Sequence, residues 1–192
     1  MDPPVLILAS GSPRRAAILG ALGIPFRSVT PSVDESLLPG ESGPAAAERL
    51  ARAKAASVLG TAGLPVLAAD TLVVCAGAVL GKPETPEAAA RMLRGLSGRT
   101  HEVVTGVCVA TRDTSRSAVE TTAVTFAAMS EAEIAWYVAT GEPLDKAGAY
   151  HVDGRGALFV ASVSGSPSNV AGLPVRLMLR LAGELGVRLG LY

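Results

Sequence analysis

The amino-acid sequence predicts an α/β fold in which helices flank a mixed, twisted sheet. Short apolar runs typical of buried strands alternate along the chain with segments whose apolar residues recur at helical spacing. Several predicted strands adjoin through hairpins, so the sheet should contain antiparallel as well as parallel neighbours. A chain of 192 residues, 49% of them hydrophobic, can bury a large core in one domain or in two closely packed lobes.

The N-terminal half carries clear signals for two helices and the strands beside them. Ser12 is a suitable N-cap, Pro13 a suitable first helical residue and Gly23 a suitable stop, while Pro44 opens the second helix. The predicted elements are a strand over 5–9, a helix over 12–22, a loop over 30–43, a helix from 44, a strand over 65–69 that ends in Asp70 and Thr71, and an extended stretch over 72–75.

The C-terminal half is predicted in the same way. Ala76 and Gly77 form a hairpin turn, and Ser130 with Glu133 forms a capping box that opens a helix. The remaining predictions are a helix from 85 that Gly98 ends, antiparallel strands over 101–110 and 121–127, an irregular stretch over 145–156, a strand over 158–163 and a closing helix over 174–185.

Composition excludes several classes of protein. Seventeen basic residues balance seventeen acidic ones, which argues against a nucleic-acid polymer as the partner. No apolar stretch reaches the length that spans a bilayer, and the N-terminus lacks the features of a signal peptide, so we expect no membrane partner and a cytoplasmic protein. Cys75 and Cys108 lie in apolar runs without metal-ligand spacing, which favours two reduced core thiols.

The segment from Ser10 to Arg15 (SGSPRR) joins a predicted strand to a predicted helix. Such a turn presents free backbone N–H groups and the positive end of a helix dipole, and both favour an anion. Arg14 and Arg15 oppose the dipole in the first turn of the helix, which is easier to explain if a phosphate binds there. The alternative is that both arginines lie in solvent and pair with acidic residues elsewhere.

Acidic residues at two places could serve a metal or act as a base. Asp70 directly follows four apolar residues, at the kind of strand end where ligands of α/β sheets gather, and Thr71 adds a hydroxyl. The alternative for Asp70 is a turn aspartate. Asp34 and Glu35 form a carboxylate pair that could help to hold Mg²⁺, and a solvated acidic loop is the alternative.

Only three lysines occur beside fourteen arginines, so each lysine is of interest. Lys82 lies between Gly81 and Pro83 and could meet a phosphate as a point charge, although surface turn lysines are common. Lys54 shares the apolar face of its helix, from which it could reach a cleft or extend along the surface to solvent. Tyr150, after small residues, could stack on a base or be a core tyrosine.

The sequence resembles the Maf family of nucleotide pyrophosphatases, over essentially the whole chain. Six motifs carry the resemblance in order and spacing. They are ASGSPRR at 9–15, ADT at 69–71, GKP at 81–83, LSGRTH at 96–101, DKAGAY at 145–150 and SNVAGLP at 168–174.

The resemblance implies an enzyme that cleaves the α–β bond of nucleoside triphosphates with Mg²⁺ or Mn²⁺, giving the monophosphate and pyrophosphate. It implies one Maf-type domain over 1–192, with a cleft between two lobes, an inosine triphosphatase-like fold and a homodimer. Asp70 would be the catalytic carboxylate and Glu35 its acidic partner at the metal. The residues that would hold the triphosphate are Ser10, Ser12, Arg14, Arg15, Lys54 and Lys82.

The branch of the family that prefers dTTP and UTP carries an arginine, a threonine and a glutamine as specificity residues. Arg14 and Thr71 match the first two, but Asp153 stands where the glutamine is expected. An amide both donates and accepts hydrogen bonds whereas an ionised carboxylate only accepts, so this difference bears on pyrimidine preference. Ala149 and Tyr150 still favour this branch, with modified pyrimidine nucleotides as further substrates. A 7-methyl-GTP pyrophosphatase and a nucleotide-sensing regulator of septum formation are the alternatives.

Overall fold

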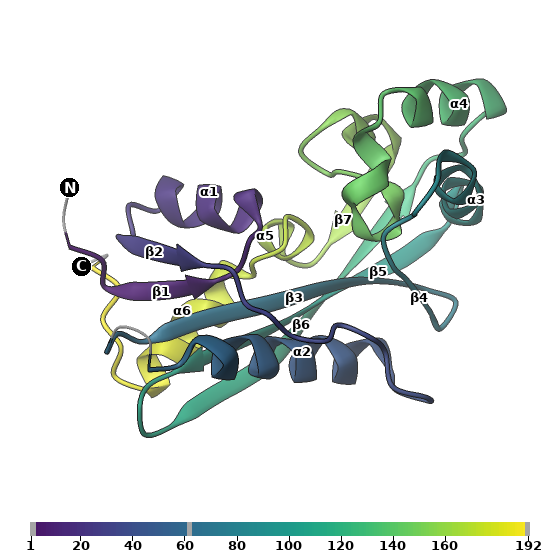
Figure 1. Cartoon of the computed structure of the whole chain (residues 1–192). Coiled ribbons are helices and arrows are strands. Elements are labelled where there is room, and N and C mark those ends of the chain that lie inside the picture. Colours follow the sequence, from purple (N-terminus) through teal and green to yellow (C-terminus); the bar gives the residue numbers. More distant parts are fainter. Residues whose placement is uncertain (1–2, 61–62, 191–192) are drawn as a thin grey trace.

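The computed structural model describes residues 3–60 and 63–190, and in these ranges a seven-stranded sheet runs through the molecule (Figure 1). Its order is β2-β1-β3-β5-β6-β7, and β4 pairs with β3 beside this path. The strands are β1 (Leu6–Ala9), β2 (Phe26–Val29), β3 (Val66–Cys75), β4 (Ala78–Leu80), β5 (Thr100–Ala110), β6 (Ser115–Phe126) and β7 (Val160–Ser164). Strand β1 is parallel to both of its neighbours, β2 and β3, and all other neighbouring strands in the sheet are antiparallel. This confirms the predicted mixed sheet.

The helices begin where the sequence signals place them. The Thr85 hydroxyl accepts from the Ala88 N–H, and Ser130 with Glu133 forms the predicted capping box. The helices are α1 (Pro13–Ala21), α2 (Gly43–Val58), α3 (Pro86–Leu96), α4 (Glu131–Ala139), α5 (Pro167–Val170) and α6 (Val175–Glu184), with 3₁₀ turns η1 (Glu142–Asp145), η2 (Ala147–Ala149) and η3 (Arg155–Phe159). Among the described residues no helix has the length and apolar character to cross a membrane.

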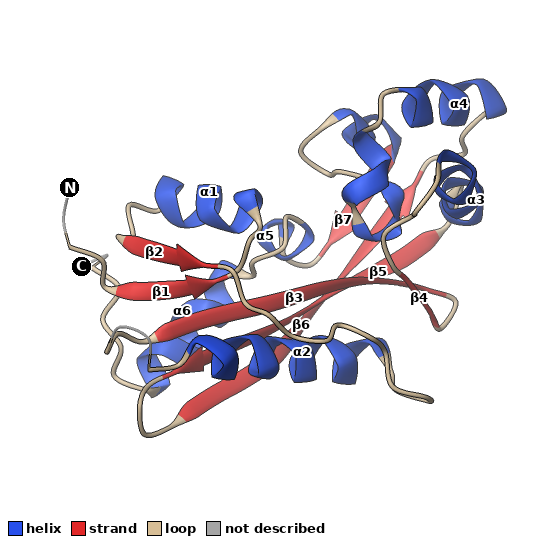
Figure 2. Cartoon of the chain, viewed as in Figure 1, coloured by secondary structure: helices blue, strands red, loops and turns tan. Residues whose placement is uncertain are grey.

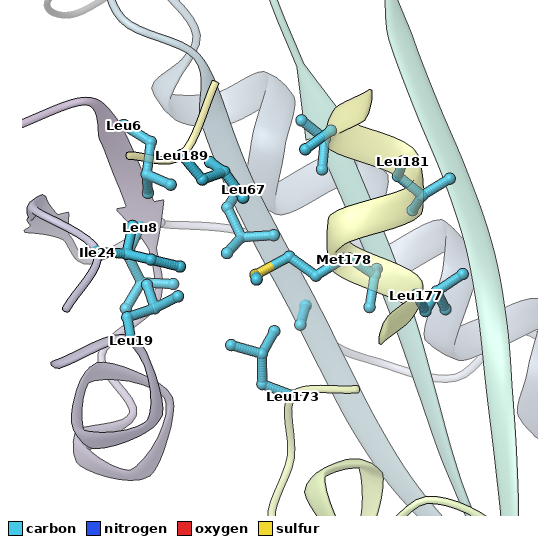
Figure 3. Close-up of a cluster of buried hydrophobic side chains, with 14 residues drawn as sticks. Leu6, Leu8, Leu19, Ile24, Leu67, Leu173, Leu177, Met178, Leu181 and Leu189 are labelled. Carbon is cyan, nitrogen blue, oxygen red and sulfur yellow. The ribbon is translucent and has the colours of Figure 1, made fainter. Parts of the chain in front are cut away.

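Alternate residues of the central strands face opposite layers of helices. Leu8 and Leu67 pack with Met178 of α6 in the cluster that Figure 3 shows. Their neighbours Ile7 and Ala68 pack instead with the alanine-rich face of α2. Because side chains alternate across a strand, α2 and α6 cover opposite faces of the sheet (Figure 2).

A separate cluster lies at the other end of the long strands. Leu93 of α3 and Ile134 of α4 pack there with Phe126 of β6 and with Tyr150, which follows η2. Figure 1 shows α3 and α4 far along β5 from α1 and α6. The connecting segments between these two groups of helices therefore border the middle of the sheet.

Helix α2 touches the sheet at Gly106 of β5. A Cβ atom on Gly106 would lie 2.2 Å from the carbonyl oxygen of Ala47, which no real Cβ contact allows. Gly106 is the direct neighbour of Asp70 in the β3–β5 register. The missing side chain thus lets the helix that carries Lys54 lie close above Asp70.

The predicted strand that ends in Asp70 and Thr71 and the extended stretch predicted over 72–75 form one continuous strand in the structure. Strand β3 continues to Cys75, since β5 pairs with it from Val66 to Val74. The parallel neighbour β1, however, pairs with β3 only as far as Ala68. Asp70 therefore lies inside its own strand but just past the point where β1 ends.

Both cysteines are free thiols, as predicted. Cys108 is buried against the α2 face of the sheet, and this burial raises its pKa to about 11. Cys75 is half-buried at the end of β3.

We predict that Gly106→Ala lowers the free energy of unfolding by roughly 1–3 kcal/mol, because the new methyl group forces α2 away from β5. Urea unfolding would measure this. Gly95→Ala is the matched control, since a Cβ at this helical position meets nothing within 4 Å. It should stabilise the protein by roughly 0.5–1 kcal/mol. Equal effects of the two substitutions would contradict the proposed close approach.

Candidate active site

A cleft of about 760 Å³ lies over the middle of the sheet, where β1 ends beside β3. Residues from both ends of the molecule line it, including the turn after β1, helix α2 and the segment around η2. The predicted site residues that line it are Ser10, Ser12, Arg14, Arg15, Glu35, Lys54, Asp70, Thr71 and Lys82. Residues separated by more than seventy positions in sequence thus border one space.

The buried Ser10 stabilises the turn after β1. The Ser10 hydroxyl accepts hydrogen bonds from the Ser12 N–H at 3.1 Å and from Arg15 at 3.1 Å. Ser12 is the N-cap of α1, but its side chain makes no capping hydrogen bond. The start of α1 therefore faces the cleft with its hydroxyl groups and the positive end of the helix dipole.

The two arginines of this turn differ in their surroundings. Arg15 is buried and donates to the Gly172 carbonyl at 2.8 Å and to the Thr71 hydroxyl at 3.0 Å, in addition to Ser10. Burial lowers its pKa, although Asp70 nearby opposes this effect. Arg14 is half-buried and forms no ion pair within 3–60 and 63–190. Arg15 thus joins three segments, whereas Arg14 remains open to a ligand.

A buried ion pair lies at the centre of the cleft. The Lys54 Nζ atom is 2.5 Å from Oδ1 of Asp70 and 2.6 Å from Oε1 of Glu35. The Lys54 and Asp70 side chains are 7% and 8% exposed, whereas that of Glu35 is 56% exposed. Removing charged groups from water costs free energy, so buried charges are normally paired. The Lys54–Asp70 pair therefore fixes α2 and β3 relative to each other.

A chain of neutral polar groups lies beside the ion pair, and no local sequence pattern predicts it. The Thr71 hydroxyl lies 3.0 Å from that of Thr105 on β5. Asn169 of α5 is fully buried and donates to the Val103 carbonyl and to the Thr122 hydroxyl, both at 2.9 Å. Asn169 belongs to the motif at 168–174, which was the only hint that a functional segment lies here.

Two further lysines, Lys82 after β4 and Lys146 before η2, line the cleft. Lys82 is exposed and follows Gly81, whose carbonyl accepts from the Gly148 N–H at 3.1 Å. This hydrogen bond ties the segment after β4 to η2. Lys146 lines the cleft too and pairs with Asp145. Lys146 was not among the predicted site residues.

The structure does not bring Asp153 to the cleft. Asp153 is exposed, and the lining comes instead from the preceding His151 and Val152. The Tyr137 hydroxyl accepts from the His151 N–H at 3.1 Å and donates to Glu142 at 2.8 Å. Glu142 also accepts from two backbone N–H groups of η3, so the loop that carries Asp153 is held between fixed points.

The carboxylates of the cleft suit a magnesium-type ion. The described residues contain no group of three or more histidine, cysteine or acidic side chains that could hold a metal by themselves. Mg²⁺ is commonly bound by one or two carboxylates together with phosphate oxygens and waters, and Asp70 and Glu35 meet at one point through Lys54. The donor set therefore fits an ion that arrives with a phosphate ligand.

Comparison with known proteins gives close relatives over nearly the whole chain. The chain is 54% identical over 187 residues to the dTTP/UTP pyrophosphatase of Anaeromyxobacter sp. (strain Fw109-5), covering 93% of this chain and 90% of the relative. It is 52% identical over 187 residues to the dTTP/UTP pyrophosphatase of Moorella thermoacetica, covering 95% of each.

Among solved structures the chain is similar to the Ham1 protein of Staphylococcus aureus, with 15% identity and a TM-score of 0.45 over 63% of this chain and 71% of that one. The family model described as Maf-like protein matches residues 5–185. The chain therefore belongs to the Maf family.

Proposed function

We propose that this protein is a nucleoside triphosphate pyrophosphatase of a single domain, which hydrolyses the α–β phosphoanhydride bond of dTTP and UTP. Its relatives named dTTP/UTP pyrophosphatase support the substrate. The observation that carries the proposal is the convergence of Arg14, Lys54 and Lys82 with the buried Asp70 on one cleft.

The charge of the cleft suits a triphosphate. Arg14 and Lys82 border it without an ion pair among the described residues, and the N-terminus of α1 adds a partial positive charge. A nucleoside triphosphate brings about four negative charges, and these groups would neutralise part of that charge. Phosphoryl transfer asks of a protein mainly this neutralisation and correct positioning.

The surroundings of Asp70 support a role as the general base. Lys54 binds its Oδ1 atom and so holds the carboxylate still, which leaves Oδ2 to take a proton from an attacking water. As the water oxygen bonds to phosphorus, the α–β bond breaks and pyrophosphate leaves. Lys54 and Arg14 would stabilise the charge that grows on the phosphate oxygens.

Asp70 and Glu35 are the residues that would hold Mg²⁺ or Mn²⁺ beside the substrate. A bound divalent cation supplies charge neutralisation on the phosphate oxygens and lowers the pKa of a nearby water. Lys54 contacts both carboxylates and would orient them toward the same ligand.

The choice among nucleotides rests on residues inside the cleft. Of the three specificity positions, Arg14 and Thr71 match the dTTP/UTP branch, and both line the cleft. Arg15 donates a hydrogen bond to the Thr71 hydroxyl at 3.0 Å. Asp153, the position that departs from that branch, lies outside the lining. The departure at this position therefore gives no reason to assign the chain to the 7-methyl-GTP branch.

We predict that the purified protein with Mg²⁺ or Mn²⁺ releases pyrophosphate from dTTP and UTP faster than from CTP, GTP or 7-methyl-GTP. Asp70→Asn should lower kcat by roughly 10²–10⁴-fold, because an amide cannot accept the proton of water. An assay of pyrophosphate release would measure both. A folded wild-type protein that is inert on every triphosphate would favour the nucleotide sensor instead.

The two neighbouring arginines should respond differently to substitution by glutamine. Arg14→Gln should raise KM at least tenfold with little change in the melting temperature, because Arg14 is open to phosphate. Arg15→Gln should lower the free energy of unfolding by roughly 2–4 kcal/mol, since it leaves buried acceptors unpaired. Steady-state kinetics and thermal unfolding separate these effects, and a reversed pattern would contradict the assignment.

Asp153→Gln should leave kcat/KM for dTTP and UTP within about twofold of wild type, because the exposed side chain does not reach the cleft. A clear gain of activity on these two nucleotides would show that the loop moves and brings residue 153 to the base. The resemblance also predicts a homodimer, which light scattering in solution would test.

A further inference from the structure

One part of the cleft wall is apolar and lies apart from the cations. Val73, Val103, Tyr150 and Val170 all line the cleft, and all belong to the buried cluster beneath α3 and α4. A phosphate gains nothing from such a surface, whereas a flat aromatic base buries its faces well against it.

Tyr150 is held in this wall by a buried histidine. Its hydroxyl lies 3.0 Å from Nε2 of His101 on β5, and the two residues are 4% and 2% exposed. The His101 and Tyr150 rings also both pack edge-on against Phe126, at centroid distances of 4.9 and 4.8 Å. The hydroxyl is thus directed into the core, and the ring position is fixed from behind.

Among residues 3–60 and 63–190, the His101 side chain forms no hydrogen bond other than the one to Tyr150. Its Nδ1 atom is buried and has no hydrogen-bond partner among the described residues. Burial lowers its pKa to about 4, so the ring is neutral at neutral pH and contributes no charge to the cleft. Burying an unsatisfied nitrogen lowers the stability of the fold. The hydrogen bond to Tyr150 is the interaction that gives a histidine at this position a role.

We propose that His101 is a positioning residue, which holds the Tyr150 ring as the wall against which the nucleobase of the substrate packs. The inference rests on the proposed function for the identity of the ligand. It accounts for two motifs that the phosphate chemistry leaves unused, at 96–101 and at 145–150. Because the hydroxyl is bonded to His101, Tyr150 contributes a surface to the base and no hydrogen bond.

The test measures binding of UTP and of inorganic tripolyphosphate, which lacks a base, by calorimetry in EDTA so that no hydrolysis occurs. His101→Phe and Tyr150→Phe should each raise the Kd of UTP about threefold to tenfold and leave the Kd of tripolyphosphate unchanged. Kinetics with metal should show the same rise in KM with kcat within about twofold.

The double variant distinguishes a shared role from two separate ones. If His101 acts only through Tyr150, the double variant binds UTP no more weakly than the weaker single variant, because both polar partners are then gone. His101→Gln, which keeps a hydrogen-bonding group, should recover part of the affinity.

Thr125→Val is the matched control. It removes the 2.8 Å hydrogen bond between Thr125 of β6 and Thr100 of β5, the strand that also carries His101. Neither threonine lines the cleft. It should change neither Kd. Equal weakening of UTP and tripolyphosphate, or unchanged UTP binding in both single variants, would overturn the inference. Failure of the proposed function would appear separately, as a wild-type protein that binds UTP and hydrolyses none.

Discussion

The ion pair between Lys54 and Asp70 is the interaction on which the site depends. It joins helix α2 to strand β3 in a region where both side chains are more than nine-tenths buried. Such a pair forms only if the backbone of the helix lies close to the sheet. Gly106 of β5, which is paired with Asp70 of β3, allows this close approach because it has no side chain. The position of one glycine thus sets the geometry of the carboxylate that would activate water.

The rest of the cleft is arranged around this pair by polarity. The turn after β1 brings Arg14 and the positive end of α1 to one side, while the valines and Tyr150 form an apolar surface on another. A ligand that is a polyanion at one end and an aromatic ring at the other matches this division. Buried Arg15 donates hydrogen bonds to Ser10 after β1, to Thr71 of β3 and to the Gly172 carbonyl. The anion-binding turn therefore cannot move independently of the sheet.

Local patterns predicted the regular elements well and the long-range contacts poorly. The capping box at Ser130 and the apolar face that includes Lys54 are both visible in sequence, because they depend on neighbours within one or two helical turns. Strand β2 was missed because its outward residues interrupt any apolar run at the sheet edge. Asn169 and Thr105 are neutral polar residues whose partners lie on other elements, so no periodicity or local charge marks their role, and only the motif at 168–174 pointed to Asn169.

The most direct test is a crystal structure with Mg²⁺ and a UTP analogue whose α–β bridging oxygen is replaced by a methylene group. The account predicts phosphate oxygens within hydrogen-bonding distance of Arg14 and Lys82, the α-phosphorus beside Asp70 and the base against Tyr150. An analogue bound outside the cleft, or one whose phosphates leave Arg14 and Asp70 untouched, would contradict it.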